Sequence, residues 1–176
     1  MVTENSTCLS FLQNHREAIA AMDFFTAPTL TFGILYCLSV IDHERRRILH
    51  CNVARNPNAL WTALQLNETW EYIDQPPRFL IFDRDPKFSA DVVSAATAVG
   101  PQPIRIALRS PWQNGIAERW IGSLRRDLLD HVIVLNERHL RRLLKDYLRY
   151  YHEDRTHLGL GKDTLPCSPR NSPLEM

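Results

Sequence analysis

Apolar runs of strand length dominate the first part of the chain. Residues 21–26 are apolar and rich in aromatic side chains, which is typical of a strand. Residues 32–41 are almost continuously apolar, as expected for a strand buried on both faces. The polar residues 42–45 then predict a hairpin turn, and residues 47–53 predict the returning strand. We therefore expect the sheet to begin with three strands joined as a meander.

After residue 55 the pattern alternates between helices and short strands. Asn56 and Pro57 are typical of a helix start, and the clearest helical periodicity is the stripe of leucines and tyrosines over residues 140–151. The order β-β-β-α-β-α-β-α-α indicates an α/β fold with a mixed sheet flanked by helices. The first of these helices ends before Pro76-Pro77 and has an apolar stripe of Leu60, Trp61, Leu64, Leu66 and Trp70. The elements expected after it are a strand over 78–82, a helix over 88–98, a strand over 104–108, a helix after residue 115 and a helix around 140–151.

The composition is that of an ordinary globular protein. Of the 176 residues, 44% are hydrophobic and 23% are charged, which argues against a disordered chain, a collagen-like repeat or a coiled coil. This length predicts one domain, and no apolar run is long enough to span a membrane. No signal peptide is visible. The cysteines Cys8, Cys37, Cys51 and Cys167 form no C-x-x-C pair, so we expect reduced thiols and a cytoplasmic location.

The net charge of +1 hides an uneven distribution of charge along the chain. Residues 1–104 contain 8 basic and 11 acidic residues, whereas residues 105–155 contain 11 basic and 7 acidic residues. The basic part is either an ordinary solvated surface or a surface that binds a polyanion. If it binds DNA phosphates, the DNA affinity is expected to fall steeply with salt concentration.

Three carboxylates stand at positions of chemical interest. Asp23 lies inside an apolar strand, where an ionised carboxylate is costly unless it is paired or binds a metal. Asp83 follows the strand 78–82, at the edge where open α/β sheets bind ligands, and Asp85 competes with it two residues later. Glu118 lies in the first turns of a helix. Each one alone also has a structural explanation: an ion pair, an Asx turn or an interaction with the helix dipole.

Together, the three carboxylates predict a metal site. If Asp23, Asp83 and Glu118 converge, their mutual repulsion requires divalent cations to neutralise them. Oxygen ligands select hard cations such as Mg²⁺ or Mn²⁺. Two such ions can stabilise both the attacking and the leaving oxygen of a phosphoryl displacement.

Five segments of the chain carry a resemblance to a known family. They are residues 22–26, 82–85, 124–131 and 150–157 and, above all, the pattern P-x-Q-N-G-x-x-E-R over residues 111–119. These segments resemble the catalytic core of DDE integrases and insertion-sequence transposases. The resemblance extends over nearly the whole chain.

The resemblance implies an RNase H-like fold, in which a five-stranded mixed sheet is flanked by helices. It implies that Asp23, Asp83 and Glu118 bind two Mg²⁺ or Mn²⁺ ions, with Asp23 bridging both. Asp83 and Glu118 have 34 residues between them, close to the spacing typical of the family. The implied reaction is metal-dependent cleavage of a DNA strand, followed by joining of a 3′-hydroxyl to target DNA. The implied partners are transposon ends, target DNA and further copies of the chain, at the nucleoid.

Residues around the start of the predicted helix are candidates for DNA contact. Gln113 and Asn114 precede the helix and could contact DNA, or could simply cap the helix. Arg119, Arg125 and Arg126 could contact phosphates. Arg119 could instead orient the neighbouring glutamate.

The chain departs from the family pattern in three ways, one of which is Asp127 in place of the downstream glutamate that the family usually has. Asp85 stands where the family usually has a glycine, so it could share or replace the role of Asp83. The 20 residues before the core are too few for the helix-turn-helix domain that family members usually carry. We therefore expect an N-terminal remnant over residues 1–20, a catalytic core over 21–157 and an irregular tail over 158–176, in a truncated gene product or a separate catalytic subunit.

Two other functions fit the same residues. A truncated or degenerate transposase fragment would keep the fold and act as a noncatalytic module for DNA binding or assembly. A nonspecific RNase H-like nuclease would cut nucleic acid without joining strands. An assay for strand transfer distinguishes the second alternative from an integrase.

Overall fold

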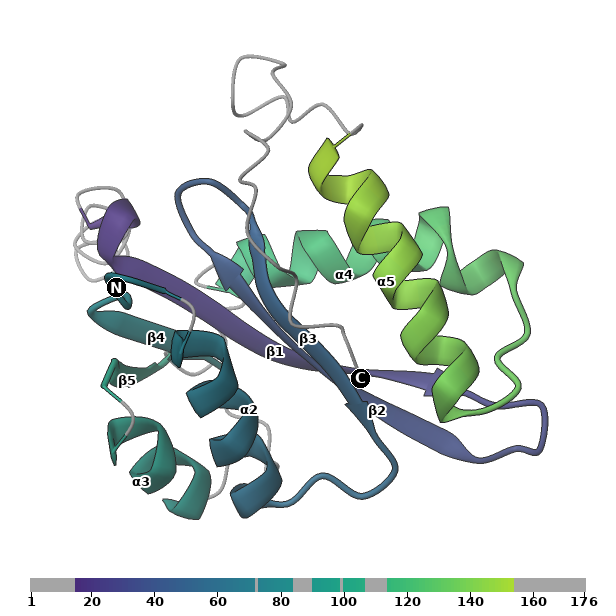
Figure 1. Ribbon diagram of the computed structural model, residues 1–176, viewed down its shortest axis with the longest axis horizontal. Helices are drawn as coiled ribbons and strands as arrows, with labels where there is room; N and C mark the ends of the chain where they lie inside the picture. Colours follow the sequence, from purple (N-terminus) through teal and green to yellow (C-terminus); the bar gives the residue numbers. More distant parts are fainter. Residues whose placement is uncertain (1–14, 72, 84–89, 99, 107–113, 154–176) are drawn as a thin grey trace, which may run out of the picture.

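A mixed sheet with helices packed against it forms the body of the protein (Figure 1). The computed structural model describes residues 15–71, 73–83, 90–98, 100–106 and 114–153. The predicted tail over 158–176 lies outside these residues, as does most of the predicted N-terminal segment. Within the described ranges, no helix has the length and apolar character needed to cross a membrane.

The five strands are arranged in the order β3-β2-β1-β4-β5. β1 pairs antiparallel with β2, and β2 with β3, whereas β4 runs parallel to both β1 and β5. The predicted α/β fold, with a meander followed by alternating elements, is therefore confirmed. The strands are β1 (Ile19–Pro28), β2 (Ile34–Asp42), β3 (Ile48–Ala54), β4 (Phe79–Phe82) and β5 (Gln102–Arg105). The helices are α2 (Ala59–Glu71), α3 (Ala90–Ala98), α4 (Gly115–Asp127) and α5 (Glu137–Glu153), with the short 3-10 helices η1 (Arg16–Ala18) and η3 (Leu129–His131).

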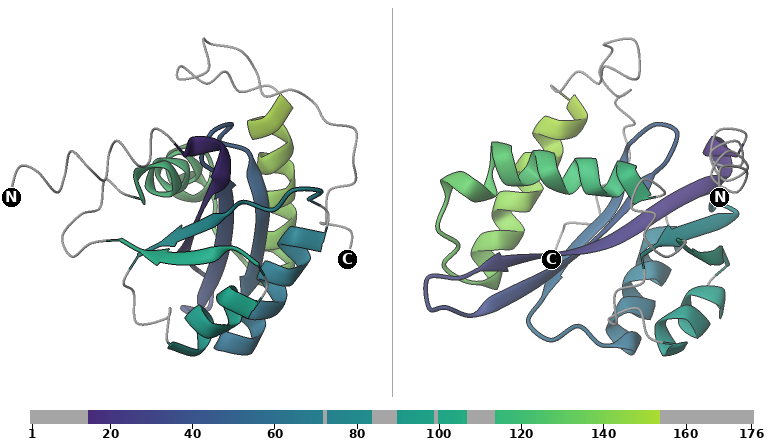
Figure 2. Two further views of the ribbon diagram at one scale, coloured as in Figure 1. Left: turned by 90° about the vertical axis from the view of Figure 1, so that its left-hand side faces the viewer. Right: turned by 180° about the vertical axis from the view of Figure 1, so that it is seen from behind.

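Alternate residues of β1 point to opposite faces of the sheet. Ala21 and Phe25 belong to the core formed with α4 and α5, whereas Ala20 and Met22 belong to the core formed with α2 and α3. The two helix pairs therefore cover different faces, and Figure 2 shows α2 and α3 side by side, away from α4 and α5. Asp23 has the same parity as Ala21 and Phe25, so it lies on the face covered by α4 and α5.

Helix α2 differs from the prediction in both its start and its buried face. The Oδ1 atom of Asn58 accepts a hydrogen bond from the backbone amide of Trp61 at 2.8 Å, so the expected start at Asn56 is wrong. Leu60 is 69% exposed and Leu64 is 50% exposed, so the predicted apolar stripe is wrong at these two positions, whereas it is confirmed at the buried Leu66 and Trp70. The buried residues of α2 are Thr62, Gln65, Leu66, Thr69 and Trp70.

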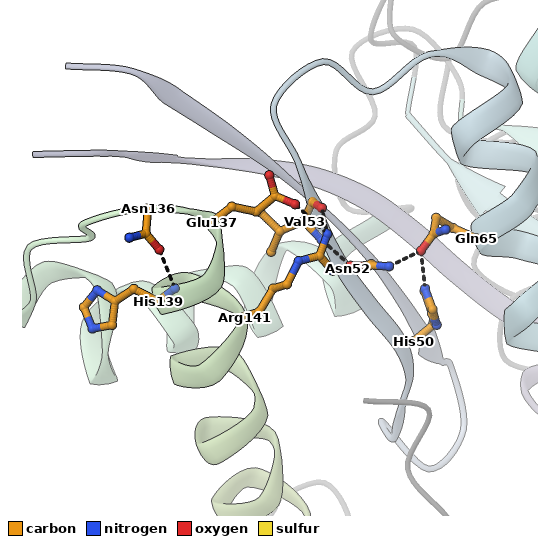
Figure 3. A network of polar contacts seen from close by, with 8 residues as sticks. All are labelled: His50, Asn52, Val53, Gln65, Asn136, Glu137, His139 and Arg141. Carbon is orange, nitrogen blue, oxygen red and sulfur yellow. Dashed lines mark hydrogen bonds and ion pairs between the residues drawn. The ribbon is translucent and has the colours of Figure 1, made fainter. Parts of the chain in front are cut away.

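A polar network around β3 explains why a glutamine of α2 faces inward (Figure 3). The Oε1 atom of Gln65 accepts hydrogen bonds from His50 Nε2 at 2.9 Å and from Asn52 Nδ2. The Oδ1 atom of Asn52 in turn accepts a hydrogen bond from Arg141 of α5, which also donates to the backbone carbonyl of Val53. Because β3 is an edge strand, Arg141 covers part of an exposed edge and links α5 to α2 through the sheet.

Aromatic side chains join α4 to α5. The ring of Trp120, which is 1% exposed, lies 4.7 Å from that of Tyr151 and 5.6 Å from that of Tyr147 between centroids. The hydroxyl of Tyr147 donates a hydrogen bond to Asp127 Oδ2 at 2.8 Å. The predicted stripe of α5 is confirmed by its buried residues, which are Leu140, Leu144, Tyr147, Leu148 and Tyr151.

Two of the four cysteines lie within the described residues, and both are buried free thiols. Burial raises the pKa of Cys51 to about 12 and also raises the pKa of Cys37. Both thiols are therefore protonated and unreactive at neutral pH, which agrees with the expected reduced state. Cys8 and Cys167 lie outside the described residues.

Phe32 adopts a left-handed backbone conformation in the hairpin between β1 and β2, with a φ of 60°. Its side chain is 97% exposed, so it contributes little packing. We expect Phe32→Gly to raise the free energy of unfolding by about 0.5–1 kcal/mol, because glycine adopts this conformation without a clash at Cβ. Urea denaturation measures the change.

The turn between β2 and β3 offers a matched comparison for this prediction. Arg46 also has a positive φ of 56°, whereas the neighbouring Arg45 does not. Arg46→Gly should therefore stabilise the protein, and Arg45→Gly should destabilise it by about 0.5–1 kcal/mol. Equal effects of the two substitutions would show that backbone strain does not decide the outcome.

Candidate active site

An open cavity between β1 and α4 contains two of the three predicted catalytic carboxylates. Its volume is about 490 Å³. Asp23 enters it from β1 and Glu118 enters it from α4. The complete lining is Asp23, Phe24, Phe25, Thr26, Glu118, Ile121, Gly122 and Arg125. Residues distant in sequence thus meet at one place on the face of the sheet that α4 and α5 cover.

Asp23 is held on a central strand. It pairs with Ser39 in the antiparallel register of β1 and β2, and the Ser39 hydroxyl lies 3.5 Å from the Asp23 backbone carbonyl. One carboxylate oxygen, Oδ1, accepts a hydrogen bond from the backbone amide of Phe24 at 2.8 Å. The strand therefore fixes the position of this half-buried carboxylate at the cavity wall.

Asp83 comes directly after β4, the parallel neighbour of β1. The register of these strands pairs Ala21 with Ile81, and counting two residues further along each strand reaches Asp23 and Asp83. The paired part of the two strands ends at Ala21 and Ile81, before the two aspartates, and Asp83 is not among the residues that line the cavity. Asp85, the alternative candidate for the metal-binding role of Asp83, lies outside the described residues.

Glu118 is exposed and lies in the first turn of α4. Ile121, Gly122 and Arg125 line the cavity on the same helix, at three, four and seven residues beyond Glu118. This is the spacing of one helix face. The sequence interpretation singled out Arg125 but missed Ile121 and Gly122, although the helical spacing from Glu118 could have identified both. A Cβ at Gly122 would lie 3.3 Å from Arg126 Nη1, so the missing side chain leaves room for that guanidinium.

Asn114 connects the start of α4 to β1. It occupies the N-cap position, but its side chain makes no capping hydrogen bond, so the capping alternative is wrong for Asn114. Its Nδ2 atom instead donates to the backbone carbonyl of Met22 at 3.4 Å. The side chain is buried, and its Oδ1 atom has no partner among the described residues. Asn114 therefore anchors the first turn of α4 next to Asp23, while contact with DNA stays a prediction.

The candidate DNA-binding arginines lie at different places on α4. The half-buried Arg125 lines the cavity, and its Nη2 atom donates to the backbone carbonyl of Thr26 at 3.3 Å. Arg119 and Arg126 are exposed and lie outside the cavity lining. The cavity therefore has one cation facing two carboxylates. Gln113, the fifth candidate, lies outside the described residues.

The donor atoms at this site suit a hard divalent cation. Asp23 and Glu118 offer carboxylate oxygens in one cavity, and Asp83 offers two more at the end of the neighbouring strand. Mg²⁺ and Mn²⁺ prefer such oxygen ligands. Among the described residues, however, no three Asp, Glu, His or Cys side chains lie together as a metal site. Asp23 and Glu118 thus line the same cavity, and Asp83 is not among the residues that line it.

Comparison with protein families gives one match within this region. A family model described as an integrase core domain matches residues 99–164, which include α4 with Glu118 and the whole of α5. No curated protein matches the sequence.

Solved structures match over most of the chain. A chain of the simian T-cell lymphotropic virus intasome, in complex with PP2A regulatory subunit B56 gamma, has a TM-score of 0.64 and 14% identity; the match covers 89% of this chain and 59% of that one. The HTLV-2 integrase catalytic core domain, in a dimeric form with magnesium, has a TM-score of 0.61 and 13% identity, with coverages of 85% and 93%. The catalytic domain of Mos1 mariner transposase has a TM-score of 0.65 and 13% identity, with coverages of 81% and 78%.

These comparisons confirm the predicted fold. The chain has the five-stranded, RNase H-like architecture of retroviral integrase and mariner transposase catalytic cores. The predicted resemblance to DDE integrase and transposase cores is confirmed as well. The chain spans 59% of the intasome chain that it matches.

Proposed function

We propose that this protein is a catalytic core that cleaves and joins DNA strands in integration or transposition. The observation that carries the proposal is the meeting of Asp23 and Glu118 at one cavity. The fold shared with integrase and transposase cores supports DNA as the substrate. The position of Asp83 at the end of the strand beside β1 supports its role as the third carboxylate.

In this proposal, Asp23, Asp83 and Glu118 hold two Mg²⁺ or Mn²⁺ ions. Solved structures of the HTLV-2 core with magnesium, and of the Mos1 domain with Mg and with Mn, support this choice. The bound cations would supply charge stabilisation at the scissile phosphate and a lowered pKa for an attacking water. The chain itself would position the metal-binding carboxylates on β1 and α4. The proposed reaction needs only metal and positioning, without a covalent intermediate with the protein.

The basic and polar residues of α4 would hold the DNA around the cavity. Arg125, which lines the cavity, would donate hydrogen bonds to a phosphate oxygen of the strand that enters it. Arg119 and Arg126, both exposed, would contact phosphates further out, and Gln113 and Asn114 would act near the start of the helix. Further copies of the chain would join in the DNA complex, at the nucleoid in the cytoplasm. The dimeric form of the HTLV-2 core supports the oligomer.

Calorimetric titration with Mg²⁺ and Mn²⁺ tests the proposed metal site. We expect saturable binding that Glu118→Gln weakens by about tenfold or more, because the loss of even a supporting group costs a metal site about 10–100-fold. Glu44→Gln, at an exposed position in the β2–β3 turn, is the control and should leave binding unchanged. Repeating the titration with a nicked duplex tests whether DNA completes the site.

The two alternative functions predict different results. A noncatalytic fragment would bind neither cation, with or without the nicked duplex. A nonspecific nuclease would bind metal and cut the duplex, but in a strand-transfer assay it would give no joined products. Joined products that require Mg²⁺ or Mn²⁺ would support the integrase function.

A further inference from the structure

Four basic residues form a stripe along α5. Their spacing of four, three and four residues places them within about 60° of arc around the helix and over about 16 Å of its length. All four side chains are exposed. The residues of this α5 stripe are Arg138, Arg142, Lys145 and Arg149.

The α5 stripe is separate from the packing of the helix. The side of α5 opposite to it is buried against α4 and the sheet. Arg141, the remaining arginine of α5, points to the edge of β3, where it donates hydrogen bonds to Asn52 and Val53 (Figure 3). It also forms a 2.7 Å ion pair with Glu137. Arg141 thus has a structural role, whereas the stripe faces solvent.

An acidic residue of α5 forms a weak ion pair with one residue of the stripe. Arg149 Nη2 and Asp146 Oδ1 lie 4.0 Å apart, on side chains that are 70% and 63% exposed, so their attraction is weak. Neighbouring members of the stripe are three or four residues apart and carry the same charge, which destabilises a helix. A polyanion bound along the stripe would offset this repulsion.

We propose that the α5 stripe binds the phosphate backbone of duplex DNA, as a second contact surface outside the cavity. The choice of DNA over other polyanions rests on the proposed function. The stripe spans about five base pairs of duplex. A straight row of charges suits the regular spacing of phosphates, and it carries no means of reading bases. α4 and α5 cover the same face of the sheet, so DNA on the stripe would lie on the side that holds the cavity.

Fluorescence anisotropy with a labelled duplex of random sequence, in EDTA, tests this proposal. The test variant replaces all four stripe residues by glutamine. The control variant also removes four positive charges, at exposed arginines outside α4 and α5. These control positions are Arg16, Arg45, Arg47 and Arg55. We expect the stripe variant to lose about 100-fold or more in affinity at 0.1 M salt, and the slope of log K against log salt to become shallower by about 2–4.

The outcomes separate this proposal from failure of the proposed function. If both variants lose affinity equally, net charge and not the stripe binds DNA, and the proposal is overturned; unchanged binding by the stripe variant overturns it too. Because EDTA removes the metal, these results do not depend on catalysis. A wild-type chain that binds duplex through the stripe yet yields neither nicks nor joined strands with Mg²⁺ would support the stripe and contradict the proposed function. A thermal melt of the stripe variant, expected at or above the wild-type value, excludes unfolding as the cause.

Discussion

Asp23→Asn is expected to reduce metal-dependent DNA cleavage by about 10³-fold or more, the scale of loss when a group that stabilises transition-state charge is removed. The substitution keeps the shape of the side chain and an oxygen that can accept the hydrogen bond from the Phe24 amide. It removes the negative charge on which the proposed metal site depends. A nicking assay with a labelled duplex and Mg²⁺, at matched protein concentrations, measures the loss.

The controls for Asp23→Asn separate chemistry from folding. Asp130→Asn, at an exposed position in η3, removes the same charge outside the cavity and should retain activity. Asp83→Asn should match the loss at Asp23, whereas Asp85→Asn should do much less. If Asp85→Asn abolishes cleavage and Asp83→Asn does not, Asp85 is the ligand. Wild-type cleavage by the Asp23 variant would contradict the assignment of the catalytic residues.

The strands could be predicted from the sequence because local pattern decides them. The central strands are buried on both faces, so their apolar runs stand out from the polar turns between them. β1, β2 and β3 were each found within a few residues of their observed bounds. β5 was expected over 104–108 but begins at Gln102. It includes Pro103, which lowers strand propensity but is tolerated on an edge strand.

The face of α2 could not be predicted, because tertiary contacts decide it. A search for apolar spacing favours Leu60 and Leu64, which are exposed. Gln65 is buried instead, because His50 and Asn52 of β3 satisfy its amide oxygen. Nothing in the local sequence shows that these polar partners, on a strand more than ten residues earlier, will lie opposite this helix.

The candidate site was only partly accessible from the sequence. Asp23, Asp83 and Glu118 could be named from their positions and from the resemblance, but the meeting of Asp23 and Glu118 at one cavity depends on how α4 lies across β1. That placement comes from long-range contacts, such as the hydrogen bond from Asn114 to the Met22 carbonyl and that from Arg125 to the Thr26 carbonyl. The spacing of residues along the sequence predicts neither of these contacts.

Trp120→Ala is expected to lower the free energy of unfolding by about 3–5 kcal/mol, the usual cost of removing a large buried aromatic side chain. Trp120 is 1% exposed and lies against Tyr147 and Tyr151 of α5. Its Nε1 atom has no hydrogen-bond partner among the described residues, so the loss comes from packing. Urea denaturation measures the change, and Leu64→Ala, on the exposed side of α2, should cost less than about 1 kcal/mol.

The same substitution also tests whether packing between α4 and α5 positions the cavity. Trp120 lies two residues beyond Glu118 on α4, on the side of the helix that faces the core. A domain of this size is stable by only about 5–15 kcal/mol, so Trp120→Ala should remain mostly folded at low temperature. If packing positions Glu118, metal affinity will then fall in the folded variant, while the more conservative Trp120→Phe retains it. Unchanged metal affinity in folded Trp120→Ala would instead show that the anchor of Asn114 on β1 is sufficient to place the first turn of α4.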